Sequence, residues 1–160
     1  MRVRTFVWAI VILAATAAAP LHGQGSVKSR FIGNYKLVKF ESFDANGKPG
    51  PGQYDEGRIM YDAAGQMAAQ LMRSARPKTN PTNESERSAA YQTYFAYYGG
   101  YTIDESKGMV VHHLQGSSSP ASTGTDFVRY YKFSDDGKFL TLSVKNAKGQ
   151  VTGVLTWERF

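Results

Sequence analysis

The sequence predicts an all-β fold, namely an eight-stranded up-and-down antiparallel barrel with one inserted helix. Eight short runs of strand-forming residues recur along the chain, and tight-turn dipeptides separate most of them. Several runs alternate apolar and polar residues, which is the period of a strand with one buried face. The 160 residues suffice for one domain with a core, and the absence of cysteine excludes disulfides. A two-sheet sandwich is the alternative arrangement of the same strands.

The beginning of the chain has the pattern of a secretory signal peptide. Arg2 and Arg4 form a positively charged start, residues 6–15 are an apolar run, and small residues follow at a cleavage site. We therefore expect residues 1–24 to be removed as a signal peptide and residues 25–160 to form the barrel domain.

The same segment sets the expected location of the mature protein. An uncleaved membrane anchor is the alternative, but residues 6–19 fall short of the roughly 20 residues that a spanning helix needs. Cleavage after Ala18 and cleavage after Gly23 both fit the pattern. Without cysteine, a lipoprotein anchor is excluded. We expect an exported protein, periplasmic or extracellular, with no stable membrane anchor after cleavage.

The expected strands cover most of the mature chain. Dipeptides such as Asn46-Gly47 and Asp136-Gly137 are typical of tight turns between antiparallel strands, because glycine accepts the positive φ that these turns require. We expect strands over residues 34–43, 57–61, 66–72, 100–104, 109–115, 126–133, 139–145 and 151–159.

One segment between the strands is predicted to be a helix. Asn83 can cap it, and Glu86 three residues later completes a capping box. An aromatic stripe at helical spacing follows, and Gly99-Gly100 ends the helix. The stripe consists of Tyr91, Tyr94, Phe95 and Tyr98. Such a helix either docks its aromatic face on the barrel or forms a lid whose aromatic side chains touch a ligand.

Arg129 is the strongest candidate for a functional side chain. It shares a strand face with aromatic residues, and a charge on an apolar face is unfavourable unless it is paired. The planar guanidinium can bind the carboxylate or enolate of a ligand. Alternatively it forms an internal ion pair, packs on a tyrosine, or lies outside because the two faces are reversed. Its expected face-mates are Phe127, Tyr131 and Phe133, and the candidate ion-pair partners are Glu41, Glu56 and Asp104.

The two adjacent histidines in an expected strand, His112 and His113, point to opposite faces. No metal site is predicted, because only His22 remains elsewhere and a zinc site takes about three or four protein ligands. We expect His112 to face inward with Val110 and Leu114. There it bonds either a ligand or a tyrosine hydroxyl of the core.

Aromatic and methionine side chains complete the expected binding site. Tyrosine and tryptophan offer apolar area with one polar group, and methionine adapts to irregular ligands. The interior of an eight-stranded barrel is both core and pocket, so plain packing is the alternative role. The expected ligand-binding residues are Tyr61, Met67, Leu71, Tyr101, His112, Arg129, Tyr131 and Trp157. No catalytic residue and no cofactor are predicted.

The two ends of the mature chain carry a family resemblance. The segment around Gly33 and Tyr35 resembles the first-strand Gly-x-Trp signature of lipocalins, with tyrosine in place of tryptophan. Arg159 resembles the late arginine that packs on that aromatic ring in lipocalins. The match is closer to the lipocalin-like domain family of bacteria and fungi, and the stretches that carry it are 33–41, 57–76, 97–101 and 112–131. The resemblance implies a calycin-type barrel with a helical insertion. It implies no particular ligand, although some members are encoded beside polyketide-type biosynthetic genes.

The leading hypothesis is an exported barrel that binds a small, largely apolar or amphipathic organic molecule in its lumen. The alternative is an isomerase or cyclase acting on a small unsaturated or polyketide-like substrate, with His112 or a tyrosine beside Arg129. An interaction module with a filled interior is a third possibility. Loss of Arg2 and Arg4 lowers the net charge from +6 to +4, and the remaining basic residues are scattered, so no nucleic-acid partner is expected.

Overall fold

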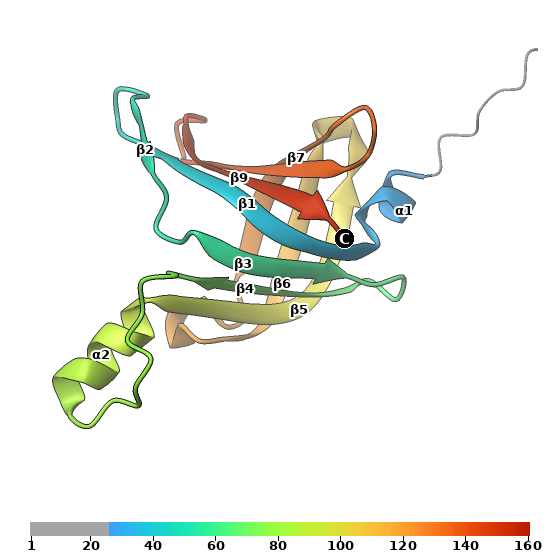
Figure 1. Cartoon of the computed structure of the whole chain (residues 1–160). Helices are drawn as coiled ribbons and strands as arrows, with labels where there is room; N and C mark the ends of the chain where they lie inside the picture. Colours follow the sequence, from blue (N-terminus) through green and yellow to red (C-terminus); the bar gives the residue numbers. More distant parts are fainter. Residues whose placement is uncertain (1–25) are drawn as a thin grey trace, which may run out of the picture.

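The structure is a computed structural model that describes residues 26–160, so the expected signal peptide lies outside the described residues. About half of the described residues form strands, and a helix is inserted between two of them (Figure 1). The strands are β1 (Gly33–Phe43), β2 (Pro49–Pro51), β3 (Glu56–Tyr61), β4 (Gln66–Met72), β5 (Tyr94–Asp104), β6 (Met109–Ser117), β7 (Asp126–Phe133), β8 (Phe139–Lys145) and β9 (Val151–Arg159). The helices are α1 (Val27–Phe31) and α2 (Glu84–Gln92), with short 3-10 turns at η1 (Glu105–Lys107) and η2 (Pro120–Ser122).

The sheet closes on itself. Each strand from β3 to β9 pairs antiparallel with the next, and β1 pairs with both β3 and β9. Eight strands therefore form an up-and-down barrel, as the sequence predicts, and the sandwich alternative is excluded. The short strand β2 is absent from the sequence prediction and extends only the far end of β1, where Glu41 lies opposite Pro51.

The boundary between α2 and β5 corrects the sequence prediction. The helix ends at Gln92, and residues from Tyr94 onward form a strand, whereas the sequence predicts helix as far as Tyr98. The physical reason is pairing with β4, which runs without interruption from Tyr94 opposite Met72 to Gly100 opposite Gln66. Aromatic residues favour strands. Pairing with β4 also gives this segment the tertiary packing without which a short helix is only marginally stable.

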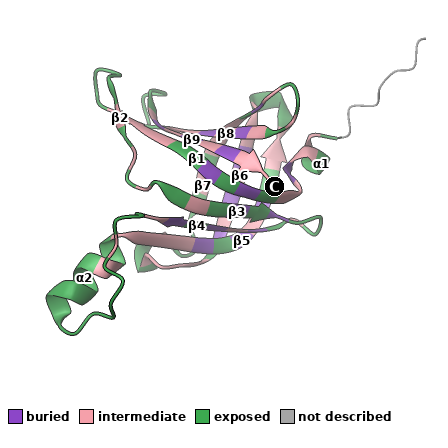
Figure 2. Cartoon of the chain, viewed as in Figure 1, coloured by how far each residue is buried: buried purple, intermediate pink, exposed green. Residues whose placement is uncertain are grey.

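Helix α2 projects from the barrel and has no buried residue (Figures 1 and 2). The predicted cap is confirmed, because the side chain of Asn83 accepts a hydrogen bond of 3.0 Å from the Glu86 N–H. The Glu86 carboxylate bonds the N–H and hydroxyl of Thr82 rather than Asn83, so the capping box is shifted by one residue. Only Tyr91 of the helix hydrogen-bonds to the barrel, through a 2.8 Å bond to the Ser118 carbonyl. No helix within residues 26–160 is long and apolar enough to cross a membrane.

Aromatic side chains seal the end of the barrel beside α1, which we call the closed end. Phe31 of α1 is fully buried there. Its ring lies edge-on to Tyr61, Tyr131 and Phe133, with centroid distances of 5.2, 5.1 and 5.0 Å. Edge-to-face contacts of this kind stabilise a core beyond the burial of apolar area. The helix α1, absent from the sequence prediction, thus acts as a plug.

The seam between β1 and β9 is fastened by the residues of the sequence signature. The Arg159 guanidinium lies 4.7 Å from the Tyr35 ring centre and donates to the Ile32 carbonyl at 2.7 Å. It also contacts the Arg30 carbonyl and the Tyr35 hydroxyl. Burial raises the pKa of Tyr35 to about 12, so its hydroxyl stays protonated and donates a hydrogen bond to the Arg30 carbonyl. Gly33 has a φ of 145°, and a Cβ there would lie 2.5 Å from Arg159 Nη1.

We expect Arg159→Lys to lower the free energy of unfolding by about 2 kcal/mol, because lysine keeps the charge but loses the planar fork that bonds several oxygens while stacking on Tyr35. The control is Arg58→Lys, which alters an exposed arginine stacked on Phe160 and should change stability by less than about 0.5 kcal/mol. Urea unfolding measures both. Equal losses in the two variants would contradict the role given to the seam.

Candidate functional site

A cavity of about 300 Å³ opens at the end of the barrel opposite α1, and we call it the mouth cavity. Every barrel strand except β6 contributes to its wall. Apolar side chains dominate the wall, and none of the lining residues is acidic. Its deeper wall consists of Ile59, Leu71, Leu142, Leu155 and Trp157, and its outer wall includes Phe40, Phe95, Phe127 and Val144. A concave apolar site with a few polar groups is the usual form of a small-molecule pocket.

The mouth cavity continues into a groove beside the inserted helix. Gln53, Tyr54 and Phe95 line both the cavity and a groove of about 650 Å³ between α2 and the barrel rim. Tyr91 of α2 also lines this groove. The insertion therefore borders the entrance, although it does not cover the barrel.

Arg129 lies on the inner face of β7 and lines the mouth cavity. Its guanidinium lies 4.8 Å from the Phe127 ring centre and donates one hydrogen bond, of 3.0 Å, to the carbonyl of Val128. It forms no ion pair with any carboxylate in residues 26–160. Of the alternatives that the sequence leaves open, the inward face is therefore observed and the internal ion pair is not.

A hydrogen-bonded chain of three rings lies beside this arginine, and we call it the Tyr–His–Tyr chain. His112 is fully buried in β6, and its Nε2 lies 2.8 Å from the Tyr61 hydroxyl. Its Nδ1 lies 3.1 Å from the Tyr97 hydroxyl. Tyr97 also lines the mouth cavity, so the chain runs from the cavity wall into the core. The predicted bond between a core histidine and a tyrosine is confirmed, with two tyrosines rather than one.

Burial keeps the Tyr–His–Tyr chain uncharged. Burial, together with the positive charge of Arg129, lowers the pKa of His112 to about 3. Burial also raises the pKa of Tyr61 and of Tyr97, although Arg129 opposes both shifts. At neutral pH the histidine is therefore a neutral imidazole, which donates from one nitrogen and accepts at the other.

The indole nitrogen of Trp157 is buried without a hydrogen-bond partner among residues 26–160. Trp157 is almost fully buried and lines the mouth cavity. Its Nε1 is the one buried side-chain nitrogen or oxygen without a hydrogen-bond partner in the part of the chain that the structure describes. An unsatisfied buried donor costs free energy, so native structures rarely keep one without a reason.

The structure separates the eight expected site residues into layers. Leu71, Arg129 and Trp157 line the mouth cavity. Tyr61 and His112 lie one step deeper, in the Tyr–His–Tyr chain. The remaining members belong to the closed end of the barrel or to the wall near it, and they are Met67, Tyr101 and Tyr131. For all eight, a role in ligand binding stays a prediction.

The expected set of ligand-binding residues omitted Phe95 and Tyr97, which line the mouth cavity, although Phe95 belonged to the stripe that the lid alternative placed against a ligand. Both fell inside the segment predicted as a helix. The available signal was alternation, because Phe95, Tyr97, Tyr101 and Ile103 all occupy odd positions of one strand and pack in the core. Gly99 interrupts the apolar series because a Cβ there would lie 1.9 Å from the His113 carbonyl oxygen.

The second histidine, His113, lies on the outer face of the barrel, as predicted. Its Nε2 is 2.9 Å from the Thr102 hydroxyl, and its Nδ1 is 2.8 Å from the Asp126 carboxylate. The side chains of His113 and Asp126 are 42% and 59% exposed, and none of the three residues lines the mouth cavity or the groove beside α2. Within residues 26–160, no three His, Asp or Glu side chains lie close enough to hold a metal ion.

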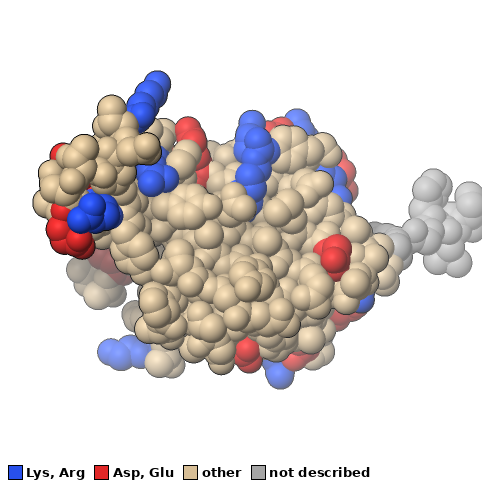
Figure 3. Space-filling model, turned by 90° about the horizontal axis from the view of Figure 1, so that it is seen from below, with Lys and Arg blue, Asp and Glu red and all other residues tan. Residues whose placement is uncertain are grey.

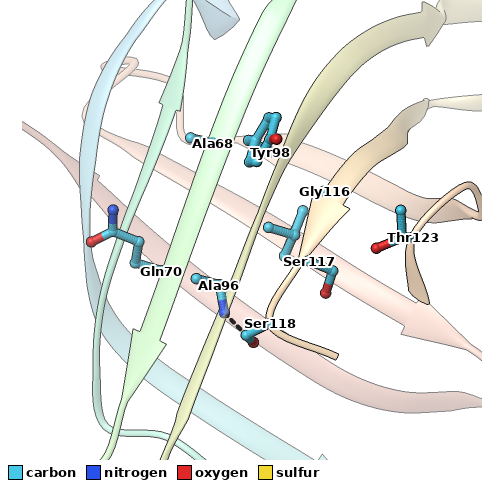
Figure 4. Close-up of a pocket in the computed structure, with 9 residues that line it drawn as sticks. Ala68, Gln70, Ala96, Tyr98, Gly116, Ser117, Ser118 and Thr123 are labelled. Atoms are coloured by element: carbon cyan, nitrogen blue, oxygen red, sulfur yellow. Dashed lines mark hydrogen bonds between the residues drawn. The ribbon is translucent and has the colours of Figure 1, made fainter. Parts of the chain in front are cut away.

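A second hollow, of about 420 Å³, lies on the outer face over β4, β5 and β6 (Figure 4). Ala68, Tyr98 and Gly116 lie side by side across it, and a Cβ on Gly116 would lie 2.5 Å from the Tyr98 ring. Uncharged side chains dominate the face seen from below, where Lys and Arg are scattered rather than gathered (Figure 3). The hollow has no charged lining residue, so the mouth cavity is the better candidate site.

Comparison with known proteins places the fold in a family. Residues 32–160 match the profile of the family described as a lipocalin-like domain. The chain belongs to this family. No curated protein matches the chain. Among solved structures, a redesigned β-barrel is similar at 9% sequence identity and a TM-score of 0.43, covering 83% of this chain and 94% of its own. Membership of the lipocalin-like family supports a ligand-binding barrel.

The buried histidine makes stability depend on pH. The unfolded chain binds a proton at His112 below pH 6.5, whereas the folded chain does so only below about pH 3. The free energy of unfolding should therefore fall by about 1.4 kcal/mol per pH unit as pH decreases through this window. Urea unfolding at several pH values should show a smaller slope in His112→Asn than in the wild type. The matched control, His113→Asn, should keep the wild-type slope, and loss of the slope there would contradict the assignment.

Proposed function

We propose that this protein is an exported barrel that binds a small, largely apolar organic molecule in the mouth cavity. The observation that carries the proposal is a cavity of about 300 Å³ with an apolar and aromatic wall at the end of the barrel opposite α1. Binding there removes apolar ligand surface from water, which supplies most of the affinity of such pockets. Membership of the lipocalin-like family supports the same reading. The export part of the proposal rests on the sequence pattern of residues 1–24.

An isomerase or cyclase is the second candidate, because Tyr97 and Arg129 line one cavity and His112 lies behind Tyr97. A neutral tyrosine beside a guanidinium can protonate or stabilise an enolate. Binding is nevertheless the stronger proposal. Burial lowers the pKa of His112 and raises that of Tyr97, so neither group is poised to remove a proton near neutral pH.

The test uses a neutral apolar fluorophore, N-phenyl-1-naphthylamine, titrated into the mature protein. We expect saturable fluorescence with one site per chain. Val144→Trp places a large side chain in the mouth cavity and should weaken binding by about tenfold or more. The matched control is Val128→Trp, since Val128 is 40% exposed on the outer face of the neighbouring strand β7. It should bind the fluorophore as the wild type does.

Two results would contradict the proposal. One is the absence of saturable binding to the folded wild-type protein, with folding verified by circular dichroism. The other is equal weakening in Val144→Trp and Val128→Trp, which would show that the fluorophore binds outside the mouth cavity.

A further inference from the structure

We propose that the mouth cavity selects an apolar organic acid, whose carboxylate is bound by the Arg129 guanidinium and by a Tyr97 hydroxyl that the buried Tyr–His–Tyr chain orients toward the ligand. This inference rests on the proposed function and adds the chemical class of the ligand. It depends on the direction of two hydrogen bonds, on the balance of donors and acceptors in the wall, and on the unpaired charge of Arg129.

The direction of the hydrogen bonds follows from the innermost ring. The Tyr61 residue is buried at 3% exposure, and among residues 26–160 its hydroxyl has a single hydrogen-bond partner, His112 Nε2. A buried hydroxyl must donate its proton, so Nε2 is the acceptor. A neutral imidazole then carries its proton on Nδ1, which donates to the Tyr97 oxygen over 3.1 Å.

Tyr97 is left with a proton of its own. Its oxygen already accepts the bond from His112, and no other acceptor for its hydroxyl is found in the described part of the chain. Because Tyr97 lines the mouth cavity, a ligand can best supply the acceptor for its hydroxyl proton and so complete the hydrogen bonds of the Tyr–His–Tyr chain. Tyr61 and His112 are thus positioning residues, and only Tyr97 touches the ligand.

The polar groups nearest the Tyr–His–Tyr chain offer donors to the cavity, whereas the Gln53 amide elsewhere in the wall offers both a donor and an acceptor. Arg129 has N–H groups beyond the one used by Val128, and Tyr97 has its hydroxyl proton. None of the lining residues carries a carboxylate. A ligand alcohol or amine would bring a further donor to this wall, whereas an ionised carboxylate brings only acceptors.

The charge of Arg129 favours an anion over a neutral carbonyl. The guanidinium is partly buried against Phe127 and lacks an acidic partner in residues 26–160. A carboxylate matches its planar fork and makes charge-assisted hydrogen bonds, which are stronger than bonds to a neutral oxygen. A ligand acid therefore supplies the counter-charge that the protein itself does not.

The test compares octanoate with methyl octanoate, which share the apolar chain and differ in charge. Displacement of N-phenyl-1-naphthylamine at pH 7.5 measures both affinities. The wild type should bind octanoate roughly 10- to 100-fold more tightly than the ester, the range for a hydrogen bond to a charged group. Arg129→Met should abolish this preference and leave the affinity for the ester within about twofold of the wild type.

The orienting role of the Tyr–His–Tyr chain is tested by the ratio of the affinity for octanoate to the affinity for methyl octanoate. Tyr97→Phe removes the donor, and Tyr61→Phe frees His112 to take its other tautomer and accept from Tyr97. Both should lower the octanoate-to-ester ratio by roughly 3- to 10-fold, which is the effect of losing one hydrogen bond. Tyr101→Phe is the matched control, because its hydroxyl donates to the Asp62 carbonyl outside the chain. It should keep the wild-type ratio.

The outcomes separate this inference from the proposed function. A wild-type protein that binds the fluorophore but prefers the ester, or shows no preference, overturns the inference and leaves the binding function standing. Failure of the folded protein to bind any of the three probes overturns the binding function itself. If Tyr61→Phe keeps the wild-type ratio of octanoate to ester affinity, the orienting role of the Tyr–His–Tyr chain is overturned.

Discussion

The seam between β1 and β9 holds the barrel closed, and the rest of the structure depends on it. A sheet of eight strands would otherwise expose two long edges, and closure removes both. Arg159 fastens the seam by stacking on Tyr35 and bonding the carbonyls that connect α1 to β1. The same contacts hold Phe31 over one end of the lumen. That end is sealed among residues 26–160, and the mouth cavity lies at the opposite end.

The interior is divided by its chemistry along the barrel axis. Aromatic rings fill the closed end, where Tyr61 and Tyr101 pack around Phe31. Aliphatic and aromatic side chains leave space at the mouth. Between them lies His112, the one buried polar or charged residue among those described. A buried imidazole is unfavourable unless both nitrogens are bonded, and two tyrosines from β3 and β5 meet that need. An apolar residue of similar size would pack there without such partners, which agrees with the orienting role proposed for the Tyr–His–Tyr chain.

The comparison of sequence and structure is informative at β5. Phe95 and Tyr97 carry a strand alternation that is visible in the sequence, but the aromatic spacing also fits a helix. Local patterns could not decide between the two, because the deciding interaction is the ladder with β4, about 25 residues earlier in the chain. The turn glycines raised no such ambiguity. Gly47 and Gly137, for example, have the positive φ that the turn dipeptides predict.

The sequence by itself predicted the barrel, most strand bounds, the Asn83 cap and the inward face of His112, and its family resemblance predicted the pairing of Tyr35 with Arg159, whereas the sequence left the face of Arg129 open. These features follow from the period of two, from turn chemistry and from a local signature, all of which are written along the chain. Only the tertiary structure decided which inward residues form the plug, which leave a cavity, and that Tyr97 stands between Arg129 and His112. The physical reason is that alternation along the sequence identifies inward-facing residues but does not distinguish one inward position from another. The level of each side chain along the barrel axis is fixed only when strands far apart in the sequence pair in a defined register.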